Sequence, residues 1–71
     1  MNVSDAVMHA LRASGKKQSD LTDILRVSSP QAANKKVREG IWTEEDLIAV
    51  AEFTGSRLLM QMPDGDQIEL K

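Results

Sequence analysis

The chain has 71 residues, a formal net charge of -2 and no cysteine. This length suits one small domain, which leaves no room for an enzyme cleft and favours extra stability from a partner subunit. The lack of cysteine excludes disulfides, thiolate zinc sites and thiol nucleophiles. The apolar runs are shorter than a membrane span and the N-terminus lacks a signal-peptide pattern, so we expect a soluble, cytoplasmic protein.

The charges are unevenly distributed. Residues 1–40 contain seven basic and four acidic residues, whereas residues 41–71 contain two basic and seven acidic residues. A basic half attracts phosphate even when the whole chain is weakly negative. The net charge therefore permits nucleic-acid binding, with an affinity that depends on salt.

The first helix is predicted over about residues 4–14. Ser4 is a plausible N-cap, and Val7 and Leu11 continue an apolar row that recurs every four residues. Gly15 follows, and glycine suits the left-handed position that ends a helix. This pattern predicts an amphipathic helix with one side in the core.

The second helix is predicted over residues 18–25. Leu21 and Leu25 have the spacing of one buried side. A helix of two turns is not stable alone, so packing against its neighbours must hold it. A turn over residues 26–29 joins it to the next helix, and this arrangement is a helix-turn-helix unit.

The third helix is predicted over about residues 30–39. Ala33 and Val37 lie on its narrow apolar side. Amide and cationic side chains cluster on the opposite side: Gln31, Asn34, Lys35 and Arg38. These are the groups that read base edges in a DNA major groove, although a solvated surface helix also has a polar outer side.

The fourth helix has the clearest local signal. Thr43 is predicted to cap it, with Asp46 three residues later in the capping-box position. Trp42 and Leu47 occupy the two positions of a hydrophobic staple. Gly55 is expected to end this helix.

Residues 56–71 change to a two-residue period, which predicts a β-hairpin around a turn at 63–66. One face of the hairpin is apolar and consists of Leu58, Met60, Met62, Ile68 and Leu70. A two-stranded hairpin is not stable alone in water, so we expect this face to lie on the helices. Its free edge could pair with a second copy of the chain.

Catalytic and metal sites find little support. His9 has no second ligand or nucleophile near it in the sequence. The side chains of Glu44, Glu45 and Asp46 point in different directions on a helix, and the turn at 63–66 lacks the length of a calcium loop. We therefore expect no enzyme activity, metal, cofactor or small-molecule ligand.

Residues 4–55 resemble the lambda-repressor/Cro (XRE-like) helix-turn-helix family of phage and bacterial DNA-binding proteins. The residues that carry the resemblance are Gln18, Leu21, Leu25, Val27, Ser28, the run Pro30-Gln31-Ala32-Ala33-Asn34-Lys35-Lys36-Val37, and the capped helix from Thr43. The C-terminal hairpin is similar to the Cro arrangement, in which terminal β segments support dimerisation. The chain differs from the family at Thr22, usually alanine, at Arg26, usually glycine, and in a turn one residue longer.

The resemblance implies that Gln18 contacts the DNA backbone and that Gln31, Asn34, Lys35 and Arg38 read bases. We further expect Lys16, Lys17, Gln18, Ser29 and Lys36 to hold phosphates. A positive φ at Arg26 would cost about 1 kcal/mol, so the longer turn is expected to avoid it.

The predicted fold is α+β. It has a helix-turn-helix domain of four to five helices at residues 1–55, followed by a hairpin at 56–71 that packs on this domain. The predicted function is a transcriptional regulator that binds a double-stranded DNA operator. We expect it to bind as a homodimer whose two copies join through the hairpin, and not to associate with a membrane. The alternative is a protein-binding adaptor or antirepressor on the same scaffold.

Overall fold

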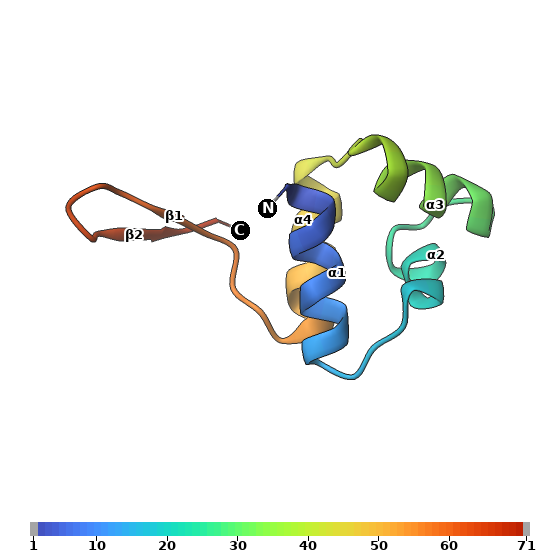
Figure 1. Ribbon diagram of the computed structural model, residues 1–71, viewed down its shortest axis with the longest axis horizontal. Helices are drawn as coiled ribbons and strands as arrows, with labels where there is room; N and C mark the ends of the chain where they lie inside the picture. Colours follow the sequence, from blue (N-terminus) through green and yellow to red (C-terminus); the bar gives the residue numbers. More distant parts are fainter. Residues whose placement is uncertain (1, 71) are drawn as a thin grey trace.

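The computed structural model describes residues 2–70, which form four α-helices, a short 3-10 turn and a two-stranded hairpin (Figure 1). In chain order the elements are α1 (Val3–Ala13), η1 (Gln18–Asp20), α2 (Leu21–Ile24), α3 (Pro30–Glu39), α4 (Glu44–Thr54), β1 (Leu59–Gln61) and β2 (Gln67–Glu69). The fold class is α+β, as the sequence predicts. Within residues 2–70 no helix has the length and apolar character needed to cross a bilayer.

Helix α1 begins earlier than the sequence predicts. The side chain of Asn2, not Ser4, is the N-cap, and it accepts a hydrogen bond of 2.8 Å from the backbone N–H of Asp5. Asparagine is as good an N-cap as serine, so the local signal could not separate the two. Ser4 therefore lies inside the first turn, where its hydroxyl is available for a tertiary contact.

The core lies between the four helices. Its buried side chains are Val7, Leu11, Leu21, Leu25, Ala33 and Val50. Leu11 from α1 and Leu21 from α2 are the largest fully buried side chains among the described residues. Helix α2 packs against both α3 and α4. Contacts with neighbours thus hold α2, whose four residues could not form a stable helix alone.

The turn between α2 and α3 contains a strained residue. Arg26 has a φ of 56°, in the left-handed region, and it follows the C-cap residue Leu25. The expectation that the longer turn avoids a positive φ is therefore wrong. A side chain in this conformation costs about 1–2 kcal/mol, and the burial of Leu21 at the start of α2 and of Leu25 just after its end must outweigh it.

The hairpin forms with the predicted apolar face but does not take the predicted position. Met60 lies opposite Ile68, so the apolar side chains share one face. Met60 and Ile68 are 53% and 51% exposed, and Figure 1 shows the hairpin extending away from the helices. The prediction that this face packs on the helices is therefore wrong. Only Leu58 and Leu70, at its base, line a groove with residues of α4.

Candidate nucleic-acid interface

Helix α3 has well-formed ends. The Oγ of Ser29 accepts a hydrogen bond of 3.2 Å from the backbone N–H of Ala32, and Pro30 occupies the first helical position. Gly40 ends the helix with a φ of 67°. A cap at each end fixes where α3 begins and ends, and therefore which side chains face outward. Ser29, predicted to bind phosphate, still has its hydroxyl proton for an outside acceptor.

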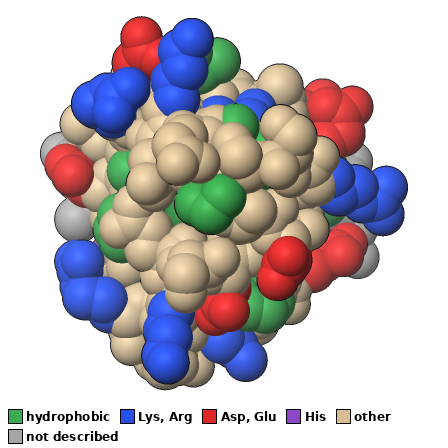
Figure 2. Space-filling view, turned by 90° about the vertical axis from the view of Figure 1, so that its right-hand side faces the viewer, with side chains coloured by type: hydrophobic (Ala, Val, Ile, Leu, Met, Phe, Trp, Pro, Cys, Tyr) green, Lys and Arg blue, Asp and Glu red, His purple; other side chains and the backbone are tan. Residues whose placement is uncertain are grey.

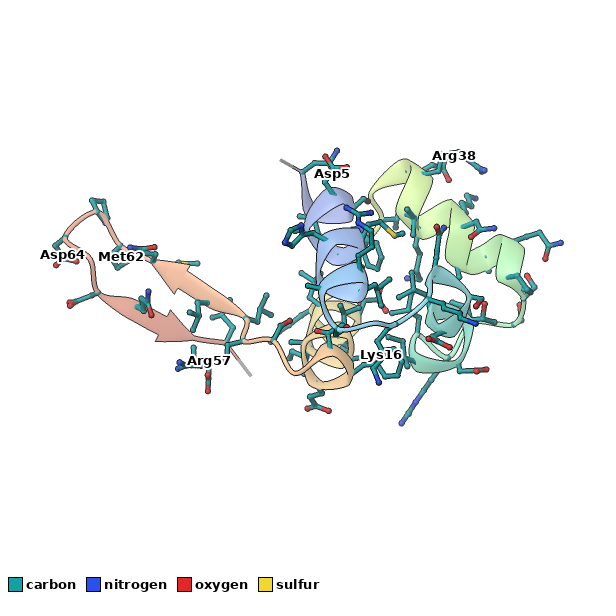
Figure 3. All side chains as sticks on the ribbon, turned by 60° about the horizontal axis from the view of Figure 1, so that its bottom comes forward. Asp5, Lys16, Arg38, Arg57, Met62 and Asp64 are labelled. Atoms are coloured by element: carbon teal, nitrogen blue, oxygen red, sulfur yellow. The ribbon has the colours of Figure 1, made fainter. Side chains whose placement is uncertain are left out.

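The two sides of α3 differ as the sequence predicts. Ala33 is buried and Val37 packs at the edge of the core. The four predicted base-reading side chains are all exposed: Gln31, Asn34, Lys35 and Arg38. In Figure 3, Arg38 extends into solvent from α3. The predicted outward orientation of these groups is confirmed, and they form an accessible row on one helix.

The end of the molecule formed by α2 and α3 faces the viewer in Figure 2. Lys and Arg side chains lie around the rim of this face, and its middle is mostly uncharged surface with a few hydrophobic side chains. Acidic side chains lie between the basic ones. On α3 itself, the Oε2 atom of Glu39 lies 3.9 Å from Lys35 Nζ, and both side chains are exposed. Such a pair contributes little, so it does not hold Lys35 away from another anion.

Gln18 lies beside α3 although the two are in different elements. The Nε2 atom of Gln18, at the start of η1, donates a hydrogen bond of 3.2 Å to Oδ1 of Asn34. Both side chains are exposed. The predicted backbone-contacting residue and one predicted base-reading residue therefore form one pair on the surface.

The two lysines before Gln18 lie on the link between α1 and η1, and both are exposed. The Nζ atom of Lys16 lies 5.0 Å from the centre of the Phe53 ring of α4. A cation over an aromatic ring at an exposed site contributes about 0.5–1 kcal/mol. Lys16 can leave the ring for a phosphate at that cost. Lys17 bonds Asp20 through its backbone: its N–H donates to the Asp20 carboxylate, and its carbonyl accepts from the Asp20 backbone N–H.

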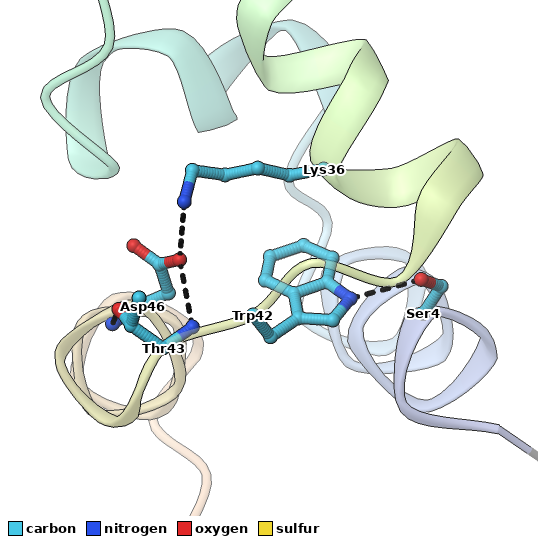
Figure 4. Close-up of polar contacts among 5 residues, drawn as sticks. All are labelled: Ser4, Lys36, Trp42, Thr43 and Asp46. Carbon is cyan, nitrogen blue, oxygen red and sulfur yellow. Dashed lines mark hydrogen bonds and ion pairs between the residues drawn. The ribbon is translucent and has the colours of Figure 1, made fainter.

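Lys36 has a different role from the one predicted. Its Nζ atom lies 2.8 Å from Oδ2 of Asp46, which is 7% exposed (Figure 4). The same oxygen accepts a hydrogen bond of 3.0 Å from the backbone N–H of Thr43 in the predicted capping box. Lys36 therefore joins α3 to the start of α4 and does not face solvent as a phosphate-binding group. We correct that assignment.

A second network also positions α3. The indole N–H of Trp42 donates to Oγ of Ser4 at 2.9 Å, and the Ser4 hydroxyl donates to the backbone carbonyl of Val37 at 2.7 Å (Figure 4). Ser4 thus connects α1, the C-terminal part of α3 and the loop before α4. Because Ser4 and Trp42 are 38 residues apart, no local pattern could have revealed this contact.

The environment of Asp46 predicts a pH dependence. Burial raises its pKa, but the hydrogen bond from Lys36, the hydrogen bond from Thr43 and the charge of Lys36 together lower the pKa below its ordinary value of 3.8. A carboxyl with a lowered pKa stabilises the folded state above its unfolded pKa, and that contribution is lost as the pH falls through the folded-state pKa.

We therefore expect Asp46→Asn to lower the free energy of unfolding by about 1–3 kcal/mol near neutral pH, because the charge-assisted bond is lost. The difference between wild type and variant should shrink as the pH falls below about 4. Urea denaturation followed by circular dichroism at several pH values measures both effects. A difference that stays constant down to about pH 2 would contradict a stabilising carboxylate at this position.

The described residues contain no group of three or more His, Asp or Glu side chains placed to hold a metal ion.

No family model, curated protein or solved structure matches the chain.

Proposed function

We propose that this protein binds double-stranded DNA sequence-specifically and regulates transcription, with α3 in the major groove. The observation that supports this most strongly is the row of four exposed side chains on α3, described above. An α-helix fits the major groove, and amide and cationic groups are the ones that recognise base edges there. On the other side of α3, Ala33 is buried in the core and Val37 packs against the core. These contacts fix the orientation of the exposed row.

The phosphate contacts in this proposal come from the link before α2 and from the start of α3. Lys17 is exposed beside Gln18, and the second N–H of Gln18 Nε2 remains available for a phosphate oxygen. Ser29 can donate its hydroxyl proton, and Lys16 can contribute its charge. These groups would set the register of α3 on the duplex, because phosphate contacts position a protein without specifying sequence.

A DNA titration tests the proposal. Duplexes selected from a random library are labelled, and binding is measured by fluorescence anisotropy at about 50 mM and 200 mM salt. If each copy neutralises about three phosphates, the affinity should fall at least tenfold between these conditions. No binding at micromolar protein, or an affinity that does not change with salt, would contradict the proposal.

We also propose that two copies bind together, through their hairpins. The apolar face of the hairpin is exposed, and a groove of about 220 Å³ between α1 and α4 is lined mainly by apolar side chains. Val3, Ala6 and Leu47 are among the residues that line this groove. Each copy thus offers an apolar face and an apolar groove, which is what a reciprocal, twofold-symmetric contact requires.

The shape of the chain favours an overlapping arrangement. The hairpin and α3 lie at opposite ends of a molecule 41 Å long (Figure 1). Two α3 helices in adjacent major grooves lie about 34 Å apart. Copies joined tip to tip would separate these helices too widely, whereas a hairpin that lies on the partner's α1–α4 groove brings the two bodies side by side. We therefore expect each hairpin to cover the groove of the other copy.

Sedimentation equilibrium tests this contact. The wild type should associate, and the double variant Met60→Glu, Ile68→Glu should remain a monomer because two charges would be buried in the contact. Both side chains are exposed in the single chain, so circular dichroism of the helices should be unchanged. A wild type that is monomeric at high concentration would contradict the contact but leave the DNA proposal intact.

The same exposed face supports a second candidate function, a protein-binding adaptor. Exposed apolar patches are typical of protein-protein contact sites. In that case the hairpin would bind a different protein, and DNA affinity would be weak and nonspecific. The DNA titration separates the two functions, since only the regulator should prefer its selected sequence.

A further inference from the structure

The outward side of α3 carries an acidic side chain, Glu39, which is the only acid of this helix. Gln31, Lys35 and Glu39 are spaced four residues apart, and residues four apart lie in one row along a helix. The Glu39 side chain is 46% exposed, whereas Ala33 and Val37 lie on the core side of α3. Glu39 therefore ends the row of side chains that the proposed function places in the major groove.

An acid at this position is unfavourable in two ways. Glu39 is the last residue of α3, directly before the C-cap Gly40, and the helix dipole disfavours a negative charge at this end. A carboxylate on a surface that faces DNA is also repelled by the phosphates. The contact with Lys35 at 3.9 Å joins two exposed side chains and offsets little of this. Residues that oppose both stability and general affinity are expected where they serve a specific function.

The chemistry of a carboxylate restricts what Glu39 can recognise. An ionised carboxylate only accepts hydrogen bonds. In the major groove guanine and thymine present acceptors, and adenine presents an acceptor beside its amino group, whereas cytosine presents the N4 amino donor alone. Cytosine is therefore the base that fits a carboxylate best. Lys35, one turn earlier on the same row, can donate to the acceptors of guanine, so the two side chains together match the groups of a G·C base pair.

We propose that Glu39 is a specificity-determining residue whose carboxylate accepts from the N4 amino group of cytosine, so that α3 selects cytosine at that base pair. The inference rests on the proposed DNA-binding function and adds a class of base that is recognised. On other sequences the carboxylate meets acceptors and phosphates without a donor. Glu39 thus weakens binding to unrelated DNA as well as favouring its own base, and both effects increase selectivity.

The experiment measures affinities for the four bases at each position of the selected duplex. Duplexes with a single half-site are used, so that a contact between two copies does not enter. Glu39→Ala locates the base pair of Glu39 as the position whose preference it flattens. There the wild type should prefer cytosine by about 5-fold or more, the lower end of discrimination by a base contact. In Glu39→Ala the affinity for unrelated DNA should rise, and the ratio of selected to unrelated affinity should fall by about 5-fold or more.

Glu39→Gln tests the recognition chemistry with a side chain of the same shape. An amide both donates and accepts, and glutamine can contact N7 and N6 of adenine together. At the same base pair, Glu39→Gln should therefore shift the preference from cytosine toward adenine. A change of charge alone would not move the preference from one base to another.

Glu52→Ala is the matched control for Glu39→Ala. Glu52 is also exposed and lies in the last turn of its helix, α4, so both variants remove one negative charge near a helix C-terminus. Thermal denaturation should show the same small change in stability for both variants. Glu52→Ala should leave the base preferences and the ratio of selected to unrelated affinity unchanged.

Two results would overturn the inference and leave the proposed function intact. One is sequence-specific binding in which Glu39→Ala flattens no base preference, or flattens a preference for a base other than cytosine. The other is an equal rise in affinity for all duplexes in Glu39→Ala and Glu52→Ala, because Glu39 would then act only through its charge. A wild type that binds no DNA would overturn the inference and the proposed function together.

Discussion

Replacing Leu21 with alanine is expected to leave little folded protein. Leu21 is fully buried in the core, on the shortest α-helix of the described chain. Truncating a buried leucine costs about 2–5 kcal/mol, and a domain of this size has only about 5 kcal/mol of total stability. The helices that pack around α2 should therefore lose their arrangement together. Thermal denaturation followed by circular dichroism measures the effect.

Ile41→Ala is the matched control for Leu21→Ala. Ile41 is 51% exposed, so its truncation should change the free energy of unfolding by less than about 1 kcal/mol. If Leu21→Ala also cost less than about 1 kcal/mol, the core would not be centred on α2 as described.

The largest expected effect on binding comes from the double variant Asn34→Ala, Arg38→Ala. Each base contact contributes about 1–3 kcal/mol of discrimination. Their joint loss should reduce the affinity for the selected DNA by about 100-fold or more and bring it close to that for unrelated DNA. Both side chains are exposed, so stability should change by less than about 1 kcal/mol. Fluorescence anisotropy with both DNAs measures the loss.

Arg57→Gln is the control for the positive charge that is lost in the double variant Asn34→Ala, Arg38→Ala. Arg57 lies at the base of the hairpin, where its Nε atom is 2.6 Å from Oε1 of Glu69, far from Arg38 in Figure 3. On a duplex with a single half-site, where the dimer contact does not enter, this variant should bind almost as well as the wild type. If the two variants lost DNA affinity equally, the total positive charge of the protein, and not α3, would determine the affinity.

The local signals in the sequence predicted the helices well because their caps act over three or four residues. Ser29, Pro30 and Gly40 define α3, and Thr43 with Asp46 begins α4 as expected. Once the ends of α3 are fixed, its helical period determines which side chains point outward. The orientation of the candidate site was therefore predictable from the sequence alone.

The long-range contacts were not predictable in the same way. The period of α3 does not show that Lys36 bonds Asp46, because the partner lies ten residues away on another helix. The bond from Trp42 to Ser4 spans more than half of the chain. A capping box can be read from spacing, but whether its carboxylate also accepts from a distant lysine depends on how the helices pack.

The hairpin shows a different limit. Alternation correctly placed Met60 and Ile68 on one face, because a strand has a period of two. The alternation of apolar and polar residues does not predict which part of the molecule covers that face. The short link of residues 55–58 directs the strands away from the helices, and this exposed position is the basis for proposing a contact with a second copy.

The central claim is that α3 is the surface that contacts DNA. The most direct test is a titration of ¹⁵N-labelled protein with its selected duplex, followed by NMR chemical shifts of the backbone and of the side-chain amides. The account predicts that the largest changes occur at residues 29–39 and at Gln18, with the amides of Gln31 and Asn34 among them. Changes confined to the hairpin or to the α1–α4 groove, with α3 unaffected, would contradict it.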